Sequence, residues 1–74
     1  MPGLIDHPSV SHAEVYEAAM RDGTMSTRLL VRTDLVMDPD AAGFDKAEHG
    51  RLMDAIKALM SHRPDIEAAD IEGR

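Results

Sequence analysis

The side chains in this sequence best suited to chemistry are its histidines and serines. Zinc sites typically use HxH, HExxH or histidine pairs four residues apart on a helix. No such spacing occurs among the four histidines, which are His7, His12, His49 and His62. The serines of PSVSH and MSH lack the GxSxG turn that exposes a hydrolase nucleophile, and there is no cysteine. We therefore predict no catalytic, metal-binding or cofactor-binding residues, and no enzyme activity.

The stretch DPDAAGFDKAEH also contains potential metal ligands. It resembles the start of the calcium loop of EF-hand proteins, with Asp38, Asp40 and Gly43 at the first two carboxylate positions and the turn glycine. Ala42 and His49 then stand where that loop has an oxygen ligand and a bidentate glutamate. An acidic loop that caps a following helix explains the same residues, so we predict no calcium site.

Composition and charge exclude several classes of partner. Eight basic residues against fourteen acidic ones give a net charge of −6, whereas phosphate backbones and anionic membranes attract basic surfaces. No apolar run approaches the ~20 residues of a membrane span. The N-terminus has neither the basic lead nor the apolar run of a signal peptide. We predict a small soluble cytoplasmic protein, with nucleic acid an improbable partner and no membrane.

Two capping-box spacings predict helices on either side of a strand. Ser11 and Glu14 predict a helix from residue 11 to about 22, after an extended lead-in over 1–10. Asp45 and Glu48 predict a helix over 46–61. This second helix has a clear apolar stripe, formed by Leu52, Met53, Ile56, Leu59 and Met60.

The segment between the helices, LLVRTDLVMD, alternates as a β-strand does over residues 28–36. Helical spacing also matches part of it, which leaves an all-α unit of three helices as the alternative. The acidic tail over 64–74 is predicted to form one or two helical turns or to be partly disordered. Its last residues, IEGR, resemble the cleavage site of the clotting protease factor Xa and receive no functional assignment.

The predicted fold is therefore α+β: an α-β-α unit over residues 11–63 with one main strand. A lone strand leaves backbone donors and acceptors unpaired, and a chain of 74 residues has a small core. Pairing with a second copy or with a larger protein would satisfy that strand. We predict an acidic, non-catalytic interaction module, acting as a homodimer or accessory subunit. The predicted interface residues are Leu29, Val31, Leu35, Met25 and Met37.

Two alternative functions use the charged residues. Arg28 and Arg32 share one face of the strand, an arrangement similar to the strand ribbon with which ribbon-helix-helix repressors read DNA. That likeness implies a transcriptional regulator with these arginines as nucleic-acid contacts. The other alternative is an acidic inhibitor that mimics nucleic-acid charge, through Asp34, Asp38, Asp40 and Asp45.

Overall fold

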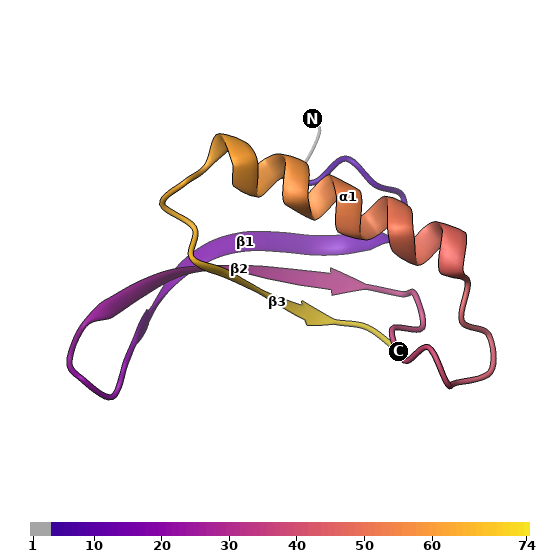
Figure 1. The fold of residues 1–74 in the computed structure, drawn as a ribbon, viewed down its shortest axis with the longest axis horizontal. Helices are drawn as coiled ribbons and strands as arrows, with labels where there is room; N and C mark the ends of the chain where they lie inside the picture. Colours follow the sequence, from indigo (N-terminus) through magenta and orange to yellow (C-terminus); the bar gives the residue numbers. More distant parts are fainter. Residues whose placement is uncertain (1–3) are drawn as a thin grey trace.

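The computed structural model describes residues 4–74 and contains one sheet and one helix (Figure 1). The elements follow in the order β1 (Val10–Ala19), β2 (Met25–Thr33), α1 (Lys46–His62) and β3 (Ala68–Glu72). In the sheet β2 is central: it is antiparallel to β1 and parallel to β3. The helix α1 connects the two parallel strands and lies against one face of the sheet (Figure 1). The predicted α+β class is confirmed, and the all-α alternative is not supported.

The helix predicted from residue 11 to about 22 is wrong, because this segment is strand β1. It pairs with β2 from Val10 opposite Thr33 to Ala19 opposite Met25. Ser11 does not cap a helix; its hydroxyl donates to the carbonyl oxygen of Arg32 at 3.3 Å. Pairing along the whole strand outweighs a local capping signal whose apolar stripe was thin.

The strand predicted over 28–36 exists three residues earlier, as β2. Its alternation is as expected: Leu29, Val31 and Thr33 are buried under the helix, and the residues between them face the other way. Between Arg28 and Arg32 this strand is paired on both sides, with β1 and with β3. It therefore has no free edge there, and any intermolecular strand pairing must use β1 or β3.

The helix predicted over 46–61 is confirmed, with one further residue at its end. The carboxylate of Asp45 accepts from the backbone N–H groups of Ala47 and Glu48, at 3.0 and 3.2 Å, and so caps the helix as predicted. Two of the apolar residues predicted to face the core, Leu52 and Ile56, are buried. The buried apolar core consists of Ile5, Leu29, Val31, Leu52, Ile56 and Ile66.

Both terminal segments belong to the same folded unit as residues 11–63. The lead-in contributes Ile5 to the core, and its Ser9 carbonyl accepts from the N–H of Asp34 at 3.1 Å. The predicted helical or disordered tail is wrong, because residues 68–72 form β3. Beyond β3, Arg74 exchanges backbone hydrogen bonds with Leu35 and Met37. In residues 4–74 no helix is long and apolar enough to cross a membrane.

Candidate functional site

The sheet face turned away from α1 carries a cluster of three polar side chains from three strands. We call this face the open face. The Arg28 guanidinium donates two hydrogen bonds of 2.9 Å to the two carboxylate oxygens of Asp70. The hydroxyl of Tyr16 donates to the same carboxylate. The strand register explains why these side chains meet. Tyr16 of β1 lies opposite Arg28 of β2, and Asp70 lies two residues beyond Ala68, which is the residue of β3 opposite Arg28.

The cluster shifts the pKa values of its three members in the directions that electrostatics requires. The hydrogen bonds from Arg28 and then from Tyr16 lower the pKa of Asp70 to about 2. The same carboxylate raises the pKa of Tyr16, because it accepts the hydrogen bond of the phenolic O–H and opposes a second negative charge. It also raises the pKa of Arg28. Asp70 is thus a carboxylate throughout the physiological pH range, and the cluster holds β1, β2 and β3 together.

This cluster predicts a specific acid sensitivity. The pKa of Asp70 is about 2 in the folded chain and 3.8 in the reference state. A carboxylate with a lowered pKa stabilises the fold above its unfolded pKa and loses that contribution as the pH falls through the folded value. We expect Asp70→Asn to unfold with a shallower pH dependence than wild type between about pH 4 and pH 2. Urea unfolding across that range measures both slopes.

The quantity to compare is the difference between wild type and Asp70→Asn in how steeply the free energy of unfolding changes with pH. The variant keeps other carboxylates with lowered pKa values, so its own slope is not zero. Hydrogen bonds from Thr24 lower the pKa of Asp22, and the guanidinium of Arg63 lowers that of Asp65. These two groups give the variant a residual slope. Equal slopes for wild type and variant would show that the Arg28–Asp70 pair contributes nothing to stability.

The second arginine of the predicted nucleic-acid face is also paired with an acidic residue. Arg32 contacts Glu72 of β3, with 3.1 Å between Nε and Oε2, at an exposed position. Next to it on β1, His12 and Glu14 approach to 3.4 Å. Each arginine of β2 is therefore matched by a carboxylate of β3. A phosphate that approached either arginine would meet the adjacent carboxylate, so this arrangement does not favour the strand-ribbon alternative.

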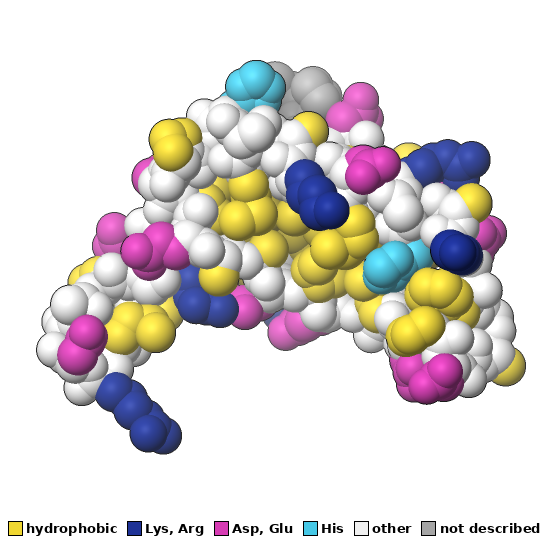
Figure 2. All heavy atoms as spheres, viewed as in Figure 1, with side chains coloured by type: hydrophobic (Ala, Val, Ile, Leu, Met, Phe, Trp, Pro, Cys, Tyr) yellow, Lys and Arg dark blue, Asp and Glu magenta, His cyan; other side chains and the backbone are white. Residues whose placement is uncertain are grey.

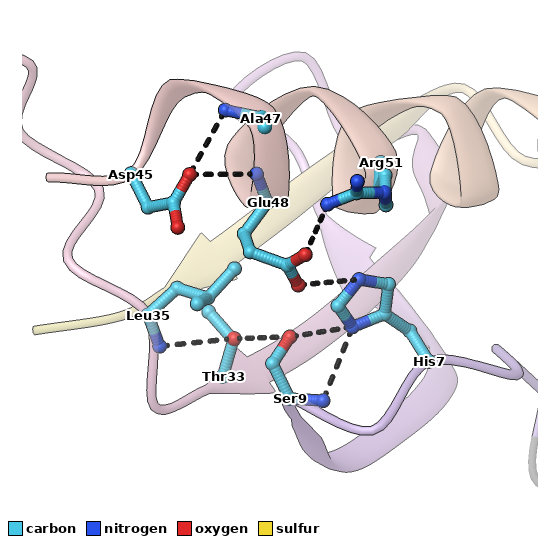
Figure 3. A network of polar contacts seen from close by, with 8 residues as sticks. All are labelled: His7, Ser9, Thr33, Leu35, Asp45, Ala47, Glu48 and Arg51. Atoms are coloured by element: carbon cyan, nitrogen blue, oxygen red, sulfur yellow. Dashed lines mark hydrogen bonds and ion pairs between the residues drawn. The ribbon is translucent and has the colours of Figure 1, made fainter.

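A polar network that the sequence did not reveal lies on the other side of the sheet (Figure 3). Ser9, His7 and Glu48 follow one another in the order of a Ser-His-Glu triad. The distances are 2.7 Å from Ser9 Oγ to His7 Nδ1 and 3.8 Å from His7 Nε2 to Glu48 Oε2. The Ser9 hydroxyl also accepts from Thr33 Oγ1 at 3.1 Å.

The triad-like order does not make a catalytic site. Ser9 is only 9% exposed, and the side chain of His7 only 7%, so no substrate reaches the hydroxyl. The nitrogen that would act as a base also accepts the backbone N–H of Ser9 at 3.1 Å. The network instead satisfies buried polar atoms where the lead-in, β2 and α1 meet. Spacing could not predict it, because Glu48 and Thr33 come from distant parts of the chain.

The predicted interface residues divide into three groups. Leu29 and Val31 are 0% exposed under α1 and present no side-chain surface to another molecule. Leu35 and Met37 are partly buried against the core, next to the end of β3. Met25 is 56% exposed at the end of the β1–β2 hairpin. Of this set, the structure leaves Met25, Leu35 and Met37 within reach of a partner.

The acidic loop before α1 is held by its own backbone. Asp38 accepts from the N–H of Asp40 at 2.9 Å, and Asp45 is the helix cap. The ring of His49 lies near that of Phe44, with 5.2 Å between their centroids. Within residues 4–74 no three acidic or histidine side chains come together as metal ligands would.

The outer edge of β1 is the longest stretch of unpaired strand in residues 4–74. Met20 donates its N–H to Thr24 across the hairpin at 2.8 Å, which fixes the direction of its backbone groups. These groups alternate along an antiparallel strand, so Glu14, Tyr16 and Ala18 bond to β2. The N–H and C=O groups that point outward belong to Ala13, Val15, Glu17 and Ala19.

Comparisons with protein-family models, with curated proteins and with solved structures found no match to this chain. The geometry of the open face and of the two sheet edges is therefore the basis for proposing a function.

Proposed function

We propose that the protein is a non-catalytic interaction module that forms a homodimer through the outer edge of β1. The observation that carries the proposal is the ten-residue length of this edge strand, whose far side pairs with no other strand in residues 4–74. Natural proteins usually shorten such edges or block them with proline or lysine, and β1 contains neither residue. Antiparallel pairing with a second copy joins the two sheets into one.

Charge complementarity selects the register of this pairing. A two-fold axis through Ala13 places His12 of each copy opposite Glu14 of the other, on the open face. Because Ala13 has outward backbone groups, His12 and Glu14 then form a non-hydrogen-bonded pair, in which side chains lie closer together. An axis through Glu14 would instead oppose two carboxylates, and an axis through Val15 gives no charge pairing.

A proline at position 13 tests the interface with little damage to the subunit. The N–H of Ala13 points away from β2, so its loss removes no bond of the β1–β2 ladder, and proline is tolerated at such edge positions. We expect Ala13→Pro to be folded but monomeric, with its molar mass falling from twice 8.1 kDa to 8.1 kDa. Light scattering on a sizing column over a hundredfold range of protein concentration measures this change.

Ala13→Ser is the matched control, because it alters the same side chain and keeps the backbone N–H. We expect it to remain a dimer. Circular dichroism of both variants separates loss of association from loss of folding. A wild-type chain that is monomeric at every concentration contradicts the proposal, and so does an Ala13→Pro variant that remains a folded dimer.

A further inference from the structure

An apolar stripe runs between α1 and β3, on the side of the helix away from the lead-in. Glu48 contacts His7 of the lead-in and so marks one flank of α1. Met53 and Met60 fall on the opposite flank, beyond Leu52 and Ile56, which face the sheet. Figure 2 shows apolar side chains gathered between α1 and β3. We define the apolar stripe by its partly buried residues, Met37, Met53, Met60, Ala69 and Ile71.

The free edge of β3 runs along this stripe. Glu67 donates its N–H to the carbonyl of Thr27 at 2.9 Å, on the side of β2 away from β1. Within β3 the register places Leu29 and Val31 opposite Ala69 and Ile71. In a parallel ladder the backbone groups of these two β2 residues bond to the residues on either side of their partners, which are Ala68, Asp70 and Glu72. The outward N–H and C=O groups therefore belong to Ala69 and Ile71. A strand added here would gain backbone hydrogen bonds on its inner edge and apolar contacts on its helix side.

The charges along β3 decide what kind of strand fits. Glu67, Asp70 and Glu72 give the segment three carboxylates, and it contains no basic residue. Self-pairing on a two-fold axis through Asp70 would bring two Asp70 carboxylates together. An axis through Ile71 would oppose Asp70 and Glu72, and one through Ala69 would set Ile71 against Glu67. A second copy of this chain is therefore disfavoured at β3, in contrast to β1.

We propose that the β3 edge binds an extended segment of another protein in which apolar and basic residues alternate. Its apolar side chains lie opposite Ala69 and Ile71 and pack on the methionines, which adapt readily to different shapes. Its basic side chains lie opposite Asp70 and Glu72 on the open face. Both carboxylates also pair with arginines of β2, but β3 lies between those arginines and the added strand, so the carboxylates are the nearer charges. This is strand addition with side-chain pockets on alternate positions. The proposal does not depend on the dimer, because the two edges lie on opposite sides of the sheet.

A synthetic peptide of about seven residues, with valine alternating with lysine, is the probe. The control peptide has glutamate in place of every lysine. Backbone amide and methionine methyl NMR spectra of the full chain are followed during titration at about 0.15 M salt. We expect the lysine peptide to bind at least tenfold more tightly than the glutamate peptide. The largest shifts should occur at the outward amides of β3 and at the methyl groups of Met53 and Met60.

Charge reversal on the protein gives the sharper comparison. Glu72 is exposed and pairs with Arg32, also exposed, so Glu72→Lys should fold. We expect this substitution to weaken binding of the lysine peptide at least tenfold. Glu17→Lys makes the same change in net charge on β1 and should alter binding less than twofold. The proposal is overturned if both variants weaken binding equally or if the two peptides bind alike. It is also overturned if the shifts map to β1, or if no binding saturates by about 1 mM peptide.

Discussion

Val31→Lys is expected to abolish the folded state. Val31 is 0% exposed, between β1 and β3 and beneath α1, so a lysine ammonium at this position has neither water nor a carboxylate within the core. The effective penalty for burying one unpaired charge is several kcal/mol even after relaxation. A single core in a chain of this length contributes only about 3–5 kcal/mol of net stability. Circular dichroism and amide NMR dispersion should therefore show an unfolded chain at 25 °C.

Leu30→Lys is the matched control for that experiment. It introduces the same side chain one residue earlier, but Leu30 belongs to the open face, opposite Glu14 on β1 and Asp70 on β3. The ammonium then lies between two carboxylates and in contact with water. We expect its free energy of unfolding to stay within about 1 kcal/mol of wild type. A folded Val31→Lys variant, or equal damage from both substitutions, would contradict the assignment of the two sheet faces.

The sequence predicted α1 and β2 because each segment has a clear spacing of apolar residues, helical in α1 and alternating in β2. The apolar positions of α1 repeat over about two and a half turns, from Leu52 to Met60, after a clear N-cap at Asp45. The alternation of β2 separates buried Leu29 and Val31 from exposed Arg32. Segment 10–19 carries contradictory signals. Its capping-box spacing favours a helix locally, whereas the register against β2 decides in favour of a strand. That register is a long-range property that no local window contains.

Leu29 and Val31 were included among the predicted interface residues for the same reason. With one strand in view, apolar residues in and just after that strand, including Leu29 and Val31, were candidates for contact with another chain. Once β1 and β3 flank that strand, Leu29 and Val31 become the core, and the unpaired backbone moves to the outer strands. The strand β3 was not predicted because the acidic tail over 64–74 has only two large apolar residues, Ile66 and Ile71, and so shows no clear strand alternation. Its strand form depends on the parallel pairing with β2 that α1 makes possible.

Leu52→Ala is expected to have the second-largest effect on stability. Leu52 is 0% exposed and faces Leu29 and Val31 from the middle of α1, within the same buried cluster. Truncating a fully buried leucine costs about 2.7–5 kcal/mol, through lost burial and the cavity that remains. Alanine is the better helix former, so helix propensity does not explain any loss. We expect the midpoint of urea unfolding to fall to a small fraction of the wild-type value.

Leu59→Ala, seven residues later on the same helix, is the matched control. Leu59 is partly exposed and packs at the margin of the core, so part of its side chain is in water already. The same truncation should therefore cost about half as much, on the order of 1–2 kcal/mol. Both variants keep the two free edges and all of the charged groups discussed above. If the two substitutions were equally costly, Leu52 would not be the centre of the core, and the helix would be rotated on the sheet. That rotation would also move Met53 and Met60 away from β3, so this pair of variants tests the position of the apolar stripe independently of any ligand.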